Sequence, residues 1–153
     1  MKKTVKTSVV IDVYNFIKDA KFSKMDDADK VAMWKICKVI KPIGEAFVKD
    51  TEDARESFIP YEGFMEDLSK ARLYEMAKQK KEPYKDMSDE EYKKFIGEWV
   101  KYNNLIGKAI EDIIKKDIEL EFDPLSKEGL EQLMLSNDWT FNQGELIESL
   151  VCE

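Results

Sequence analysis

The chain has 153 residues, of which 43% are hydrophobic and 37% charged, and its 25 basic residues against 32 acidic ones leave a net charge of −7. Such a length and composition are typical of one soluble folded domain, here residues 1–153, rather than of a disordered or fibrous protein. The chain contains no histidine, which excludes histidine-based triads, zinc sites and carboxylate-histidine di-iron sites. Cys37 and Cys152 are too few for a disulfide framework.

The distribution of charge argues against nucleic acid and membranes as partners. Arg55 and Arg72 are the only arginines, and the lysines alternate with acidic residues instead of forming the basic face that a duplex requires. No run of about 20 apolar residues is present to cross a bilayer. Asp12 and Lys18 interrupt the apolar run that a secretion signal would need. We therefore expect a protein of a reducing cytoplasm that binds neither nucleic acid nor membrane.

The N-terminal half predicts a short strand followed by two helices. Residues 4–11 are rich in β-branched side chains, and the apolar spacing then becomes helical. A long helix is predicted from Asp26 or Asp27, and we expect Trp34 in the core, Cys37 as a buried thiol and one bent helix across Pro42. Its apolar residues recur at spacings of four and three and are Met33, Cys37, Ile40, Gly44, Phe47, Thr51, Ala54 and Phe58.

A third helix is predicted over residues 62–79, followed by a mobile loop over 80–86. Ser88 and Glu91 form a capping-box pattern at the start of a second long helix, which extends to about Lys116. Gly97 and Gly107 lie inside this helix, where we expect them to allow close helix packing. The third helix is expected to offer Phe64, Met65, Leu68, Ala71 and Leu73 to the core, and the second stripe reads Tyr92, Phe95, Ile96, Trp99, Asn103, Ile106, Ile110 and Ile113.

The C-terminal part predicts a strand and two short helices. Apolar and acidic residues alternate over 117–123, which is typical of a half-buried strand, and the N-terminal strand is its natural partner. Ser126 and Thr140 then open two short helices, while Cys152 is expected to be mobile. The predicted fold class is mainly α: a bundle of long, partly kinked antiparallel helices with a small two-stranded β-ribbon and a C-terminal short-helix hairpin.

Two sets of acidic residues have spacings that could hold a metal ion. The alternating acids of 117–123 share one strand face, but the wet face of a ribbon has the same pattern. Glu128 with Glu131 and Glu145 with Glu148 have the spacing that helical nucleotide pyrophosphohydrolases use to hold magnesium beside a triphosphate. Glutamates also occupy the solvent face of any amphipathic helix. We therefore predict no catalytic, metal or cofactor residues, with the pyrophosphohydrolase kept as an alternative.

A surplus of large aromatic residues favours an interaction surface. We single out Trp139, Phe141 and Tyr84 for it, and Trp139 has a second interpretation, in which it pins the C-terminal hairpin onto the body. A small bundle seldom exposes contiguous apolar patches without a use for them. Besides the stripes, the surplus comprises Tyr61, Phe64, Tyr74, Tyr84, Tyr102, Trp139 and Phe141.

Five stretches of the chain together carry a resemblance to known proteins, namely Val10–Asn15, Lys24–Lys30, Ile40–Ile43, Ile118–Phe122 and Ser136–Phe141. On these stretches the chain resembles a family of small, functionally uncharacterised proteins encoded by bacteriophages and prophages of gut bacteria. The resemblance covers most of the chain and carries over no functional residue. It implies a phage origin and a role near virion or tail assembly.

From these observations we expect a non-enzymatic phage protein without cofactors, a virion or tail assembly accessory or a virion component, located in the host cytoplasm or in the virion. Its expected partner is a second copy of itself or another phage protein. One alternative is a counter-defence protein that binds a host protein or sequesters a nucleotide signal. The other is the magnesium-dependent all-α nucleotide pyrophosphohydrolase.

Overall fold

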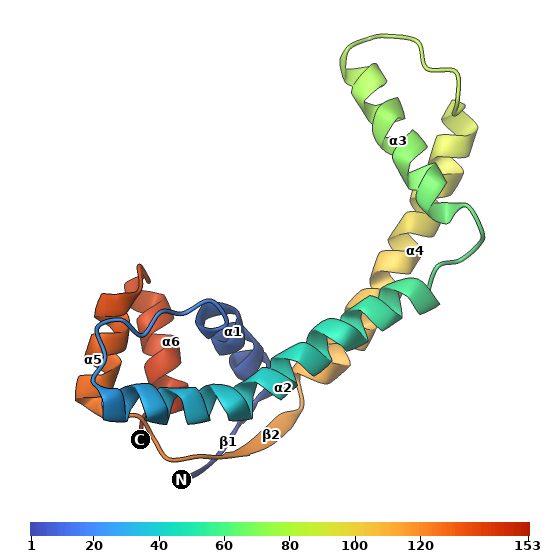
Figure 1. Ribbon diagram of the computed structural model, residues 1–153. Helices are drawn as coiled ribbons and strands as arrows, with labels where there is room; N and C mark the ends of the chain where they lie inside the picture. The colour runs from blue at the N-terminus through green and yellow to red at the C-terminus, as the bar shows by residue number, and fades with distance from the viewer. The chain divides into compact units, whose positions relative to one another are not determined.

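The computed structural model describes all 153 residues, 69% of which are helical. Six helices and one two-stranded ribbon follow one another along the chain (Figure 1), which confirms the predicted mainly α fold class with its C-terminal pair of short helices. In chain order the elements are β1 (Lys2–Lys6), α1 (Thr7–Ile17), α2 (Asp27–Ser57), α3 (Phe64–Gln79), α4 (Asp89–Ile114), β2 (Asp117–Glu121), α5 (Lys127–Ser136) and α6 (Phe141–Val151).

The chain forms two compact units, each with a hydrophobic cluster of its own. Unit 1 comprises Met1–Asp50 together with Asp112–Glu153, and unit 2 comprises Thr51–Glu111. The helices α2 and α4 contribute residues to both units. A single domain over residues 1–153 stays a prediction.

Unit 1 is built where α1, α5 and α6 gather around the N-terminal half of α2 (Figure 1). On α2, Met33 and Ile40 are fully buried, as the first stripe predicts, while Cys37 and Phe47 are only half-buried. Pro42 lies inside α2, which confirms one continuous helix. The side chains that complete this core and are shielded almost fully from solvent are Val10, Val13, Ile36, Leu133, Ile147, Leu150 and Val151.

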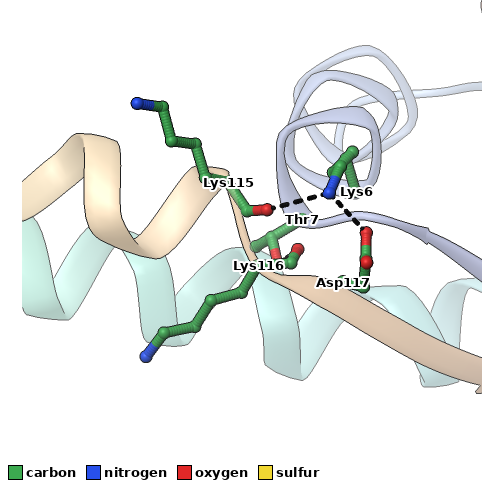
Figure 2. Close-up of polar contacts among 5 residues, drawn as sticks. All are labelled: Lys6, Thr7, Lys115, Lys116 and Asp117. Carbon is green, nitrogen blue, oxygen red and sulfur yellow. Dashed lines mark hydrogen bonds and ion pairs between the residues drawn. The ribbon is translucent and has the colours of Figure 1, made fainter.

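The two strands β1 and β2 pair antiparallel, and their register places Val5 opposite Ile118. This pairing confirms the predicted ribbon. Where β1 passes into α1, the backbone N–H of Thr7 (2.9 Å) and its hydroxyl (2.8 Å) both donate to the carbonyl of Lys116. Lys6 beside it binds Asp117 at 2.7 Å (Figure 2). Thr7 is buried. These bonds therefore hold the first residue of α1 against the residues that follow α4.

The acidic alternation of β2 forms the wet face of the ribbon, opposite lysines of β1. Asp117, Glu119 and Glu121 are all exposed, and the register places Lys6 opposite Asp117 and Lys2 opposite Glu121. Opposite charges on facing strands stabilise a ribbon modestly. The interpretation of these acids as a solvent face is thereby supported.

Lys3 ties β1 to the end of α6. Its ammonium donates to the carbonyl of Ser149 at 2.7 Å and to that of Cys152 at 2.8 Å. A cation at a helix C-terminus satisfies carbonyls that have no partner within the helix and compensates the helix dipole. The prediction that Cys152 is mobile is wrong, because its side chain is 5% exposed and belongs to the unit 1 core.

The short helices begin at the residues that their capping patterns indicate. Ser126 accepts a hydrogen bond from the backbone of Gly129 at 2.9 Å. Thr140 and Gln143 form a complete capping box, in which each side chain accepts from the backbone N–H of the other residue. Such caps satisfy backbone donors that the first helical turn leaves unpaired.

Unit 2 is held by aromatic packing between α3 and the part of α4 beside it (Figure 1). The ring of Phe64 lies 5.4 Å from Phe95, 6.0 Å from Trp99 and 5.0 Å from Tyr102 between centroids. Tyr102 also donates its hydroxyl to the backbone carbonyl of Arg55 near the end of α2, at 2.7 Å. Three aromatics that the sequence suggests as surplus, Phe64, Tyr74 and Tyr102, are therefore core residues.

Gly44 allows close packing between α1 and α2, whereas the expectation that Gly97 and Gly107 allow close packing is wrong. A Cβ atom at Gly97 or Gly107 would meet nothing within 4 Å. A Cβ at Gly44 would lie 2.3 Å from two ring atoms of Tyr14. The ring of Tyr14 on α1 therefore occupies the space that any side chain at Gly44 on α2 would need.

Gly44→Ala should lower the free energy of unfolding by about 1–3 kcal/mol, because the Tyr14 ring must move. Gly97→Ala is the matched control. It should raise the free energy of unfolding by about 0.5–1 kcal/mol, because alanine stabilises an exposed helix interior more than glycine does. Urea denaturation followed by circular dichroism measures both. Equal effects of the two substitutions would contradict the close contact between α1 and α2.

Candidate interaction surfaces

The C-terminal hairpin of α5 and α6 is held in place by side chains that bind the backbone of the 21–26 segment. Asn137 exchanges two hydrogen bonds with the backbone of Lys21, at 2.9 and 2.8 Å. Ser136 accepts from the N–H of Lys24 at 2.8 Å, and Gln132 from that of Asp26 at 2.9 Å. A segment without regular structure gains fixed partners for its backbone in this way. The hairpin end is consequently well anchored.

At that anchored end, Leu135 and Phe141 are each 76% exposed, more than any other large apolar side chain of the protein. Leu135 is near the end of α5 and Phe141 begins α6, so the two flank the turn between these helices. Trp139, within the turn, is half-buried and packs against the unit 1 core. The structure thus places Trp139 as the pin of the hairpin and Phe141 as the outward residue. Leu135 was missed.

Tyr84 points inward rather than outward. Its side chain packs against the unit 2 core, and its hydroxyl is buried without a hydrogen-bond partner. It lines a small hollow of about 320 Å³ together with Tyr74, Lys78 and Asp89. The prediction of Tyr84 as an interaction residue therefore concerns a side chain that already packs within unit 2.

Beside this hollow, two tyrosines join α3 to α4. The rings of Tyr74 and Tyr92 stack with centroids 4.2 Å apart. The hydroxyl of Tyr74 donates to Asp89, and that of Tyr92 donates to Glu75. The bond from Tyr74 lowers the pKa of Asp89, while the bond to Glu75 raises the pKa of Tyr92 to about 12.

The helix α3 is apolar on two faces. One face, with Phe64 and Leu68, is buried against α4 as predicted. Met65, Leu73 and Met76, however, are 50%, 51% and 52% exposed, so the expectation that Met65 and Leu73 are core residues is wrong. The sequence shows apolar residues on both faces of α3. The position of α4 decides which of the two faces is buried.

Trp34 is a further correction, because it lies on the surface. Its side chain is 55% exposed, and the ammonium of Lys38 lies 5.1 Å from the ring centroid. The other predicted core tryptophan, Trp99, does pack in the aromatic cluster of unit 2. A ring beside a lysine on one helix is a common cation–π arrangement.

The paired glutamates are not brought together as a metal site. Glu128, Glu131, Glu145 and Glu148 are all exposed, and no group of three or more His, Cys, Asp and Glu residues is arranged to hold a metal ion. Magnesium sites in proteins require several oxygen ligands that converge on one point. These four glutamates therefore do not converge on a magnesium site.

A hollow of about 480 Å³ lies in unit 1 between α1 and α2. Its wall includes the rings of Tyr14 and Phe22, the ammonium groups of Lys18 and Lys41, the carboxylate of Asp19 and the thiol of Cys37. Burial raises the pKa of Cys37, so this thiol is less nucleophilic than an exposed one. The combination of aromatic and cationic walls suits an anion with a flat ring system.

No family model matches the chain, and neither a curated protein nor a solved structure matches it. None of the six helices combines the length and apolar character needed to span a membrane. The surfaces themselves therefore provide the basis for a functional proposal.

Tyr92 should ionise late in an alkaline titration, at a pKa of about 12 instead of the ordinary 10.0. Because the folded state holds this proton more tightly than the unfolded state, its bond to Glu75 stabilises the fold fully below about pH 10. That contribution is lost as the pH rises towards about 12. The absorbance of tyrosinate measures the titration. Tyr92→Phe should remove one late step, and Glu75→Gln should move that step to lower pH; an unchanged curve in Glu75→Gln would contradict the bond.

Proposed function

We propose that the protein is a phage-encoded binding protein without enzymatic activity, an accessory of virion or tail assembly or a virion component. The phage origin rests on the resemblance in sequence. The binding role rests on one observation, the exposure of Leu135 and Phe141 (76% each) at the anchored end of the α5–α6 hairpin. Leu135 and Phe141 together form the hairpin patch.

The physical case for the hairpin patch combines exposure with rigidity. Exposure of an apolar side chain to water is unfavourable. A partner that buries it completely gains about 1.5–3 kcal/mol of binding free energy for each such side chain. Rigid presentation lowers the entropy cost of binding. The side chains of Gln132, Ser136 and Asn137 provide that rigidity through their bonds to the 21–26 backbone. Another phage protein with an apolar pocket is the expected partner.

The double variant Leu135→Asp and Phe141→Asp should abolish capture of a co-expressed product of a neighbouring gene while the fold is kept. Its reason is that charged residues cannot enter an apolar pocket without a large desolvation cost. Capture is measured by affinity purification and size-exclusion chromatography with light scattering, and folding by circular dichroism.

The matched control is Val48→Asp, which places a carboxylate at an exposed apolar position of α2 (46% exposed). We expect this variant to capture the partner as the wild type does. Equal capture by the wild type and the double variant would overturn the role of the hairpin patch, and no capture by the wild type would overturn the binding role.

A second candidate function, sequestration of a nucleotide signal, is favoured by the hollow beside Cys37. Its walls offer aromatic rings for stacking and two cations, Lys18 and Lys41, for phosphate against one carboxylate, that of Asp19. The hollow of about 470 Å³ in unit 2 is less suited to an anion, because Asp67, Glu91 and Glu98 outnumber Lys94 in its wall.

If the protein sequesters a nucleotide, protein purified from an infected host should release it on heat denaturation. Chromatography of the supernatant detects the released nucleotide. Lys41→Glu should reduce the amount released at least tenfold, because it replaces attraction to phosphate by repulsion, whereas Lys94→Glu in unit 2 should not change it. Absence of a nucleotide from the wild-type protein would reject this second function and leave the protein-binding role untouched.

A further inference from the structure

We propose that α3 pairs antiparallel with α3 of a second copy of this chain, through the exposed face formed by Met65, Leu73 and Met76. This face, called the α3 stripe below, is distinct from the hairpin patch, so the inference does not depend on the function proposed above. It assigns an occupant to three apolar side chains of α3 that are about half exposed.

The geometry of α3 favours pairing with another helix. The α3 stripe covers the twelve residues from Met65 to Met76, whose ends are about 16 Å apart at about 1.5 Å per residue, or three turns of one face. Ser69 lies between Met65 and Leu73 on this face, and its small side chain allows close approach. The opposite face is already filled by the contacts of Phe64 and Leu68 within unit 2. A partner helix could therefore lie along the stripe without disturbing the unit 2 core.

The charges at the two ends of α3 select a second copy as the partner. The N-terminal end carries Glu62 and Glu66, and the C-terminal end carries Lys80 and Lys81; all four residues are exposed. A twofold axis near the middle of α3 places the acidic end of each helix against the basic end of the other. Parallel pairing would bring like charges and like helix dipoles together. The helix is thus complementary to itself in one orientation only.

In this arrangement the apolar residues meet in a self-consistent register. Met65 lies against the partner's Met76, and Ser69 lies against the partner's Leu73. Glu62 comes to lie near the partner's Lys80. Because the twofold axis repeats each pair, every contact occurs twice, as in other isologous interfaces. A helix pair of this size is small for a permanent dimer, so we expect a reversible one.

The test is the mass of the protein over a range of concentrations, by sedimentation equilibrium. The wild type should approach twice the chain mass of 17.9 kDa at high concentration. Leu73→Glu should weaken the dimer at least tenfold with an unchanged circular dichroism spectrum, since Leu73 is 51% exposed. Val100→Glu, at an equally exposed position of α4 (51%) in the same unit, is the matched control and should dimerise as the wild type does.

Charge reversal tests the orientation. Glu62→Lys with Glu66→Lys should weaken the dimer, because both ends of the paired helices then carry positive charge. Adding Lys80→Glu and Lys81→Glu should restore it, since the ends are complementary again. A wild type that stays monomeric, a dimer indifferent to Leu73→Glu, or a failure of the fourfold variant to recover would each overturn the proposal. The capture assay with the hairpin patch is read separately, so either proposal can fail alone.

Discussion

The pairing of β1 with β2 is the constraint on which the rest of the fold depends. It brings Lys6 opposite Asp117, so everything between them must leave the ribbon and return to it. Two hydrogen bonds from Thr7 to the Lys116 carbonyl attach the start of α1 to the segment between α4 and β2. Lys3 of β1 attaches the end of α6 to the same ribbon. A long-range closure costs loop entropy, which the buried contacts around the ribbon offset.

The two units use different chemistry to hold their helices. In unit 1, aliphatic side chains such as Ile40 and Leu133 fill the core. Polar side chains of α5 and of its C-cap residue, Asn137, bind an irregular backbone segment. In unit 2, stacked rings replace aliphatic packing, and the tyrosine hydroxyls find carboxylates at the edge of the cluster. Large rings bury much area with few rotatable bonds, which suits a unit made mainly of two helices.

The apolar side chains that the two cores do not bury include two separate exposed surfaces, the hairpin patch and the α3 stripe. The hairpin patch is small and rigid, which suits a pocket on another protein. The α3 stripe is long and lies between ends of opposite charge, which suits another helix. The acidic residues, by contrast, are spread over the surface, where they form solvent faces.

By itself the sequence determined the features that depend on local spacing. The periods of the two stripes, the alternation around Leu120 and the capping patterns at Ser126 and Thr140 predict elements that the structure contains. Local patterns succeed here because hydrogen bonds within a helix or at its cap involve residues close in the chain.

Only the tertiary structure decided which apolar residues are buried. It covers Cys152 and Tyr102, exposes Trp34 and Leu135, and buries one of the two apolar phases of α3. The sequence singled out Phe141 but could not show that Leu135 flanks the same turn. Burial depends on surfaces that distant segments supply, such as the Tyr14 ring over Gly44. No local pattern specifies which distant segment packs against a given residue.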